Sequence, residues 1–284
     1  MRAMVIYRSH SEINSLQTRE SLIDLLSGPP PQAEWLIPNL IPKGSMIAMC
    51  GLEGVGKSVF GYTLCAALGS GLQILGRDTQ PSKILYMDEE NGHRDRRAYL
   101  YRAWVGLGRP SKEVLAENLA VHGFALLSST ADWYITLKAL AASHKPDLIV
   151  IDTVTPACRI KDENSNGEAA VAANKLRGVM NSAGADCAVL IMKHLRVNRD
   201  TGQVDMRGAK LWKGTVDAIW YHRRPSGRPR KDGLYKTYIR PEKVRAFGLQ
   251  TEIEIDAQRV EDGAGLILSG LDKPIEEKRT GWDE

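Results

Sequence analysis

Short, nearly continuous apolar runs alternate with segments of helical spacing through the middle of this chain. A strand buried on both faces is apolar throughout, whereas a strand with one solvent face alternates between apolar and polar residues. The pattern therefore predicts an α/β fold in which helices flank a mostly parallel central sheet. The expected strands are residues 45–50, 83–87, 119–125, 148–152 and 188–192, and the expected helices are residues 59–68, 94–105, 133–143 and 168–182.

The two ends of the chain follow different patterns. Residues 1–19 give weak structural signals, and the apolar residues within 21–26 predict one short helical turn before a stiff Pro-rich linker. Near the other end, short segments predict antiparallel strands joined by polar turns, at residues 218–222, 234–240 and 251–255. We expect an N-terminal arm and linker over residues 1–33, a main domain over 34–258, and a C-terminal segment with a polar tail over 259–284.

Composition narrows the class of protein. The chain has 284 residues, of which 43% are hydrophobic and 25% charged, a balance typical of soluble globular proteins. No apolar stretch is long enough to cross a bilayer, and the N-terminus lacks the apolar core of a signal peptide. The four cysteines are far apart and form no CxxC pair, which favours reduced thiols. We therefore expect a cytoplasmic protein with no membrane partner.

The formal net charge of +4 permits nucleic-acid binding without requiring it. The densest basic segment is residues 222–231, HRRPSGRPRK, which has turn residues at its centre. This segment is compatible with a DNA contact and equally with a solvated hairpin tip.

One motif carries most of the functional information. Residues 51–58, GLEGVGKS, fit the phosphate-loop pattern GxxxxGK[ST], and they lie between an expected strand and an expected helix. Backbone N–H groups in such a loop, together with the helix N-terminus, surround phosphate oxygens. Lys57 is expected to reach the β- and γ-phosphates, and the Ser58 hydroxyl to hold Mg²⁺. The motif predicts binding of a nucleoside triphosphate at Gly51, Glu53, Gly54, Val55, Gly56, Lys57, Ser58 and Val59.

Titratable residues end three of the other expected strands. Parallel sheets place ligands at the carboxyl ends of their strands, so we expect these side chains near the phosphate loop. Asp152 is positioned to orient Mg²⁺ and its waters. Among Asp88, Glu89 and Glu90, one is expected to orient or deprotonate the attacking water. His194 can hydrogen-bond the γ-phosphate, although a histidine at a strand end is equally compatible with a plain surface position.

The order of these motifs resembles the RecA-type ATPase core, and more closely the hexameric replicative helicases of plasmids of the RepA type. The resemblance spans roughly residues 34–250, which implies a RecA-like core for the predicted fold. Its matching segments are residues 34–39, 51–58, 84–90, 149–153, 162–167 and 190–194.

This resemblance implies a role for several residues. In that family the acid seven positions into the second strand segment activates water, which corresponds to Glu90, and the histidine after the fourth motif strand corresponds to His194. The segment at residues 242–248 is similar to the Lys-x-Arg segment of hexameric helicases, so Lys243 and Arg245 are implied to reach the neighbouring subunit's nucleotide. An arginine supplied in trans stabilises charge on the transferred phosphoryl group. An exposed basic turn is the alternative for this pair.

In such a ring, two basic loops would face a central pore and contact single-stranded DNA. The candidate contacts are Arg159, Lys161, Arg196, Arg199, Arg207 and Lys210. Flexible basic loops suit a phosphate backbone, but these loops lack the aromatic residues that base stacking favours, and plain solvated loops are the alternative. Arg96 and Arg97 are candidates to pack against adenine through a planar guanidinium.

The resemblance implies an ATP- and Mg²⁺-dependent ring, with six subunits expected, that moves single-stranded DNA as a replicative helicase. Further expected partners are a replication initiator or a primase, and the apolar residues of the arm (Leu22, Ile23, Leu25 and Leu26) are expected to contact a neighbouring subunit. Two alternatives stay open, namely a RecA-like recombination or repair ATPase and a regulatory ATPase that acts on a protein partner.

Overall fold

The computed structural model describes residues 22–29, 32–123, 126–162, 165–197, 204–205, 212–225, 234, 236–245 and 248–275. Contacts divide the chain into two units, residues 1–33 and residues 34–284. In the first unit the described residues contain one short helix, α2 (Leu22–Leu25), with Leu22, Ile23 and Leu26 exposed. The second unit contains the nine-stranded sheet and the candidate site.

Six neighbouring strands of this sheet are parallel, in the order β10-β3-β7-β6-β4-β5. Because they run the same way, their carboxyl ends meet at one edge, which the register confirms by pairing Gly51 with His194 and Asp88 with Asp152. The strands are β3 (Met46–Gly51), β4 (Ile84–Asp88), β5 (Leu119–His122), β6 (Leu148–Asp152), β7 (Ala188–His194) and β10 (Ala218–Arg223).

Three antiparallel strands extend the sheet beyond β10. They are β11 (Thr237–Val244), β12 (Glu252–Val260) and β13 (Gly265–Lys273), with a short 3-10 turn, η1 (Glu261–Gly263), between the last two. Residues 265–273, which the sequence suggested as part of a C-terminal segment, thus form the last strand of the main sheet. A separate two-stranded pair joins β8 (Arg196–Val197) to β9 (Val204–Asp205).

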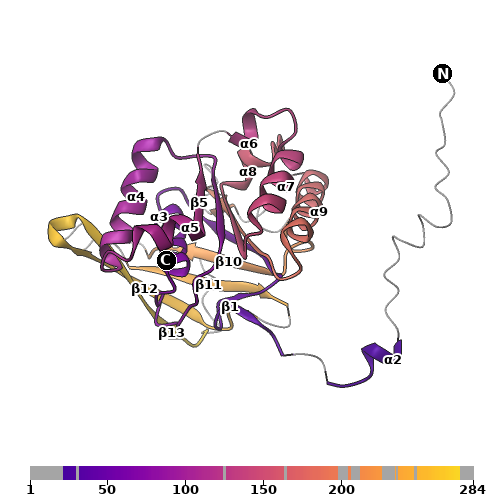
Figure 1. Cartoon of the computed structure of the whole chain (residues 1–284), viewed down its shortest axis with the longest axis horizontal. Helices are drawn as coiled ribbons and strands as arrows, with labels where there is room; N and C mark the ends of the chain where they lie inside the picture. The colour runs from indigo at the N-terminus through magenta and orange to yellow at the C-terminus, as the bar shows by residue number, and fades with distance from the viewer. Residues whose placement is uncertain are drawn as a thin grey trace. The chain divides into compact units, whose positions relative to one another are not determined.

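Helices cover both faces of the sheet (Figure 1). One face packs against α3 (Lys57–Ser70), α4 (His93–Gly106) and α5 (Lys112–Asn118). The other packs against α6 (Leu126–Ser129), α7 (Trp133–His144), α8 (Val154–Ala157) and α9 (Asn166–Ala183). Each inner strand contributes alternate residues to the two cores: Ile47 and Met49 of β3 face one core, whereas Ala48 and Cys50 face the other.

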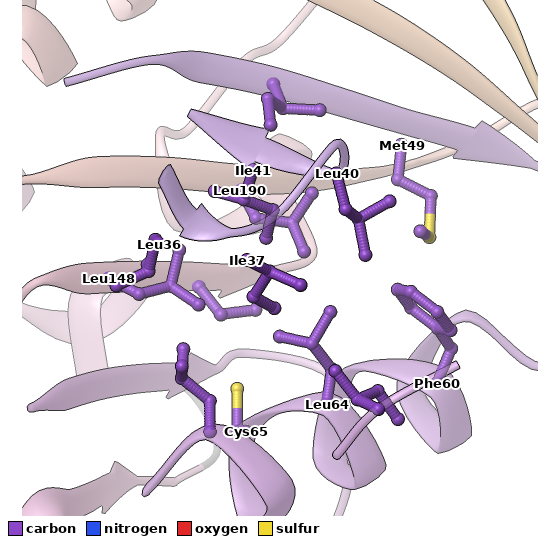
Figure 2. Close-up of a cluster of buried hydrophobic side chains, with 14 of the residues drawn as sticks. Leu36, Ile37, Leu40, Ile41, Met49, Phe60, Leu64, Cys65, Leu148 and Leu190 are labelled. Atoms are coloured by element: carbon purple, nitrogen blue, oxygen red, sulfur yellow. The ribbon is translucent and has the colours of Figure 1, made fainter. Parts of the chain in front are cut away.

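The first core also takes in a small hairpin of β1 (Trp35–Ile37) and β2 (Ile41–Pro42). Figure 2 shows Ile37 and Leu40 between the sheet and the helix that follows the phosphate loop, near Phe60 and Leu64. These four side chains are almost completely buried. Their packing fixes α3 against the sheet, which holds the start of this helix at the carboxyl edge of β3.

The predicted fold class is confirmed: a mostly parallel sheet flanked by helices, with antiparallel strands toward the C-terminus. The predicted strand at 148–152 matches β6, and β3, β4, β7 and β10 differ from their predicted bounds by one or two residues. Strand β5 ends three residues before its predicted bound, and β11 and β12 end four and five residues after theirs. No helix among the described residues is long and apolar enough to span a bilayer.

Candidate active site

The phosphate loop connects β3 to α3 in the predicted strand–loop–helix arrangement. Gly54 and Gly56 have φ angles of 71° and 103°, a region that residues with a Cβ rarely adopt, and Gly56 is the N-cap of α3. Glu53 and Gly54 are exposed at the tip of the loop, whereas Val55 is buried. The loop therefore places its backbone around the N-terminus of a 14-residue helix, as anion binding requires.

Lys57 lies in the centre of the site and is only 4% exposed. Its Nζ donates to the carbonyl oxygens of Gly51 and Leu52, each at 3.0 Å, and to Nδ1 of His194 at 3.0 Å. Burial lowers the pKa of Lys57, and the nearby carboxylates of Asp152 and Glu90 oppose that shift.

His194 connects Lys57 to Glu90. Its Nε2 lies 2.8 Å from Glu90 Oε2 and 3.0 Å from Oε1, so a proton on Nε2 leaves Nδ1 free to accept from Lys57. The hydrogen bond from His194 lowers the pKa of Glu90, against the raising effect of partial burial. The structure thus brings together Lys57, Glu90 and His194, three residues that are far apart in the sequence.

Glu89 has a different environment from Glu90. Its buried carboxylate accepts hydrogen bonds from the N–H groups of Leu127 and Ser128 and from the Ser128 hydroxyl, at 2.8 to 3.1 Å. This side chain holds the first turn of α6 and does not face the phosphate loop. The choice of Glu90 over Glu89, made through the family resemblance, therefore agrees with the hydrogen bonds of both residues.

Asp152 ends β6 beside Ser58 and is completely buried. Burial raises the pKa of Asp152 to about 6, and hydrogen bonds from Ser58 and Tyr86 oppose the rise. Its Oδ1 has no hydrogen-bond partner among the described residues, which is unusual for a buried carboxylate oxygen.

These residues fit the Mg²⁺ that the phosphate loop implies. A free carboxylate oxygen and a hydroxyl are the hard oxygen ligands that Mg²⁺ prefers, with waters and phosphate oxygens completing the shell. Ser58 and Asp152 would hold the ion, and its positive charge would offset the negative charge of the phosphates.

A cavity of about 370 Å³ opens beside the phosphate loop. This volume lies within the range of small-molecule sites. The first residues of α3 (Val59 and Phe60), His222 at the end of β10, and strands β11 to β13 form its walls, with apolar contributions from Ile255, Leu266 and Leu268. Arg102 of α4 also lines this cavity, together with Arg224 and Arg259.

Arg97, predicted to contact the nucleotide, does not line this cavity. It lies on another face of α4, beside a separate apolar cavity of about 450 Å³ that Tyr101, Trp104 and Leu119 also line. Five residues on an α-helix turn the side chain by about 140°, so Arg97 and Arg102 lie on different faces of α4. The N–H group of the Arg96 guanidinium donates to the Asn91 carbonyl at 2.8 Å.

Lys243 and Arg245 lie at the opposite edge of the sheet. Val244 pairs with Ala218, which in turn pairs with Ile47 at the start of β3, about 13 Å of strand from Gly51. Arg245 bonds the Asp217 carboxylate at 3.3 Å and the Gly214 carbonyl at 3.1 Å, and Lys243 donates to the carbonyls of Lys213 and Val216. Neither side chain reaches the phosphate loop of its own subunit.

The predicted DNA contacts divide into three groups. The Arg159 guanidinium donates to the carbonyls of Ser128 and Ala131 at 2.9 to 3.3 Å, while Lys161 is exposed. Arg196 is the first residue of strand β8. Arg199, Arg207 and Lys210 lie outside the described residues.

Sequence reasoning missed several side chains beside the site: Tyr62, Tyr86, Asn91, Arg102 and His222. Tyr86 lies inside an apolar strand and Tyr62 inside an apolar helix, so the pattern marks both as ordinary core residues. The only sequence signal is the two hydroxyls themselves, since a buried hydroxyl requires a partner.

Comparisons with known proteins identify the family. A family model described as AAA domain matches residues 12–200, and a search of curated proteins found no match. Among solved structures, a KaiC-like protein from the hyperthermophilic archaeon Pyrococcus horikoshii OT3 is similar, with a TM-score of 0.54 and 13% identity over 84% of this chain and 99% of that one. At this identity the likeness concerns the fold alone. The chain therefore belongs to the AAA domain family and is a P-loop ATPase with a RecA-like fold.

Proposed function

We propose that this protein is an ATP-hydrolysing motor that assembles into a ring and moves single-stranded DNA. The observation that carries the hydrolytic part is the connected set Lys57–His194–Glu90 next to Asp152 at one sheet edge. These side chains supply a cation for the phosphates, a carboxylate for the metal and a base for the water.

Each group has a defined task in this proposal. Lys57 exchanges its contacts with Gly51 and Leu52 for oxygens of the β- and γ-phosphates. Glu90 orients the attacking water and accepts its proton, and its lowered pKa keeps the carboxylate ionised before the proton arrives. His194 bonds both Lys57 and Glu90, so it is placed to change partners when the γ-phosphate leaves.

The nucleoside part of ATP fits the cavity between α3 and the β12–β13 hairpin. Its apolar walls suit a base, and we assign the stacking arginine to Arg102 in place of Arg97. Arg102 is exposed on α4 and lines the same cavity as the phosphate loop, which places it within reach of a bound nucleoside.

The site within one subunit supports a proposal of ring assembly. Transition-state charge on the phosphoryl group needs a further cation beyond Lys57, and Lys243 and Arg245 lie at the far edge of their own sheet. We propose that they complete the site of the next subunit, in a ring of about six, and that the apolar arm residues help to hold neighbours together.

A regulatory ATPase that acts on a protein partner is the second candidate. The hydrogen bonds of Arg159 to Ser128 and Ala131 favour it, because they engage one of the basic side chains expected to contact DNA. Both candidates share the same hydrolytic site.

Steady-state ATP hydrolysis with and without single-stranded DNA, on a preparation whose mass is measured by light scattering, separates the two. The motor predicts at least tenfold stimulation by DNA and a mass near six subunits. A monomer with turnover that ignores DNA would contradict the motor and favour the regulatory ATPase. Lys57→Ala is the control, because it removes hydrolysis under either function.

A further inference from the structure

Two tyrosines lie stacked beneath the catalytic carboxylates. Tyr62 belongs to α3, Tyr86 belongs to β4, and neither has any exposed surface. Their ring centroids are 4.3 Å apart with an interplanar angle of 21°. Burial raises the pKa of both hydroxyls, so each is a neutral donor at every physiological pH.

The Tyr86 hydroxyl fixes one half of the site. It donates to Oδ2 of Asp152 at 2.9 Å, and both groups are completely buried. Oδ1 of the same carboxylate is the atom without a partner among the described residues. The hydrogen bond from Tyr86 to Oδ2 therefore helps to set the direction in which Oδ1 points.

The Tyr62 hydroxyl fixes the other half. It donates to Oδ2 of Asp88 at 2.7 Å. Oδ1 of Asp88 accepts from the backbone N–H groups of Glu90, at 3.2 Å, and Asn91, at 2.8 Å. Asp88 thus holds the turn that carries Glu90, and Tyr62 holds Asp88.

We propose that the Tyr62–Tyr86 pair positions both catalytic carboxylates: Tyr86 aims Asp152 at Mg²⁺, and Tyr62 acts through Asp88 to hold Glu90 against the attacking water. The proposal rests on the ATP hydrolysis of the proposed function, but not on DNA or on a ring. Both tyrosines are positioning residues, since neither touches the reacting atoms.

The backbone of α3 approaches the Tyr86 hydroxyl closely at Gly61, where there is no room for a side chain. A Cβ at Gly61 would lie 2.9 Å from the Tyr86 hydroxyl oxygen and 2.4 Å from the terminal methyl of Met192. Packing alone would be satisfied by phenylalanine at both positions, without the cost of burying two hydroxyls. Because each hydroxyl ends on an acid at the sheet edge, the arrangement serves the carboxylates and not only the core.

Three isosteric variants test the proposal. Tyr86→Phe and Tyr62→Phe each remove one hydroxyl and keep the stacked rings. Tyr99→Phe is the matched control, because its ring lies 5.9 Å from that of Tyr62, whereas the hydroxyls that bond Asp88 and Asp152 are those of Tyr62 and Tyr86. Thermal unfolding of each variant checks that the fold is retained.

The first readout is binding, not activity. The affinity for a fluorescent ATP analogue is measured in EDTA and across a Mg²⁺ titration. Tyr86→Phe is expected to raise the half-saturating Mg²⁺ concentration roughly tenfold and to leave the affinity in EDTA within twofold of wild type. Tyr62→Phe and Tyr99→Phe are expected to leave both quantities within about twofold.

The second readout is turnover at saturating ATP and Mg²⁺. Tyr62→Phe is expected to lower it at least tenfold, whereas Tyr99→Phe leaves it unchanged. The proposal would be overturned if Tyr86→Phe lost nucleotide affinity equally in EDTA and in Mg²⁺. It would also be overturned if Tyr62→Phe kept wild-type turnover. A wild-type protein that hydrolyses ATP without DNA stimulation would contradict the motor alone, and the tyrosine comparison would still decide this proposal.

Discussion

At the scale of single residues, adjacent side chains of the same type have different tasks. Glu89 and Glu90 are chemically identical neighbours at the end of β4, yet one is buried against α6 and the other faces His194. The side-chain pattern does not separate them, because a strand that ends in a turn gives no rule for which acid points to which side. The family resemblance supplied the choice, and the hydrogen bonds supply its physical reason.

This difference predicts opposite outcomes for two conservative variants. Glu90→Gln is expected to lower turnover at least 100-fold while nucleotide affinity and thermal stability stay near wild type, since only the base is lost. Glu89→Gln is expected to lower the free energy of unfolding by about 2 kcal/mol, because it weakens the hydrogen bonds to Leu127 and Ser128. Turnover assays and urea unfolding measure the two effects, and the reverse pattern would contradict the assignment.

His222 makes stability depend on pH. It is buried against the phosphate loop, and burial lowers its pKa to about 3. Between the ordinary pKa of about 6.5 and this value, the unfolded chain binds a proton that the folded chain does not, so stability falls as the pH falls.

From pH 6.5 to pH 5 this single group is expected to cost the fold about 2 kcal/mol. His222→Asn removes the titration, so its free energy of unfolding should fall less than that of wild type over this interval. Urea unfolding at several pH values measures the difference, with His93→Asn, an exposed histidine at the start of α4, as the control. Parallel curves for wild type and His222→Asn would be incompatible with a neutral buried imidazole.

At the scale of elements, the apolar runs predicted the inner strands well because both faces of each strand are buried. The edge elements were harder to predict. Strand β13, at the sheet margin, has only its first two residues buried, and its other residues are partly buried or exposed. Helices α6 and α8 have only four residues each, too few for a helical period to be visible. Their positions depend on tertiary contacts such as those of Glu89.

The short helix α6 is held by Glu89 at its first turn and by Arg159, which donates to the carbonyl of Ser128 within the helix and to that of Ala131 just beyond it. Arg159→Ala is therefore expected to lower the free energy of unfolding by about 1 to 2 kcal/mol. Lys161→Ala, two residues away and exposed, should leave stability unchanged and serves as the matched variant. If Arg159→Ala weakened binding of single-stranded DNA without any loss of stability, Arg159 would be a DNA contact, as first predicted, and the structural role would be wrong.

At the scale of the whole molecule, the parallel sheet explains why the residues of the candidate site could be predicted to lie together. Parallel strands bring their carboxyl ends to one edge, so residues that end separate strands meet there regardless of their distance in sequence. Strand β11 runs antiparallel to β10, so Lys243 and Arg245, near the carboxyl end of β11, lie at the other edge. Their proposed role depends on a second subunit, and no pattern within one chain specifies that contact.

A shared site predicts that two inactive variants restore each other. A Lys57→Ala subunit has a defective phosphate loop but still supplies Lys243 and Arg245 to the next subunit. An Arg245→Ala subunit keeps its phosphate loop but cannot supply Arg245. The most direct measurement is therefore ATP hydrolysis by each variant alone and by mixed assemblies co-expressed in equal amounts. The account predicts little activity for either variant alone and roughly one quarter of wild-type activity for the mixture, because one interface in four combines two intact halves. A mixture no more active than its separate components would contradict a catalytic site shared between subunits.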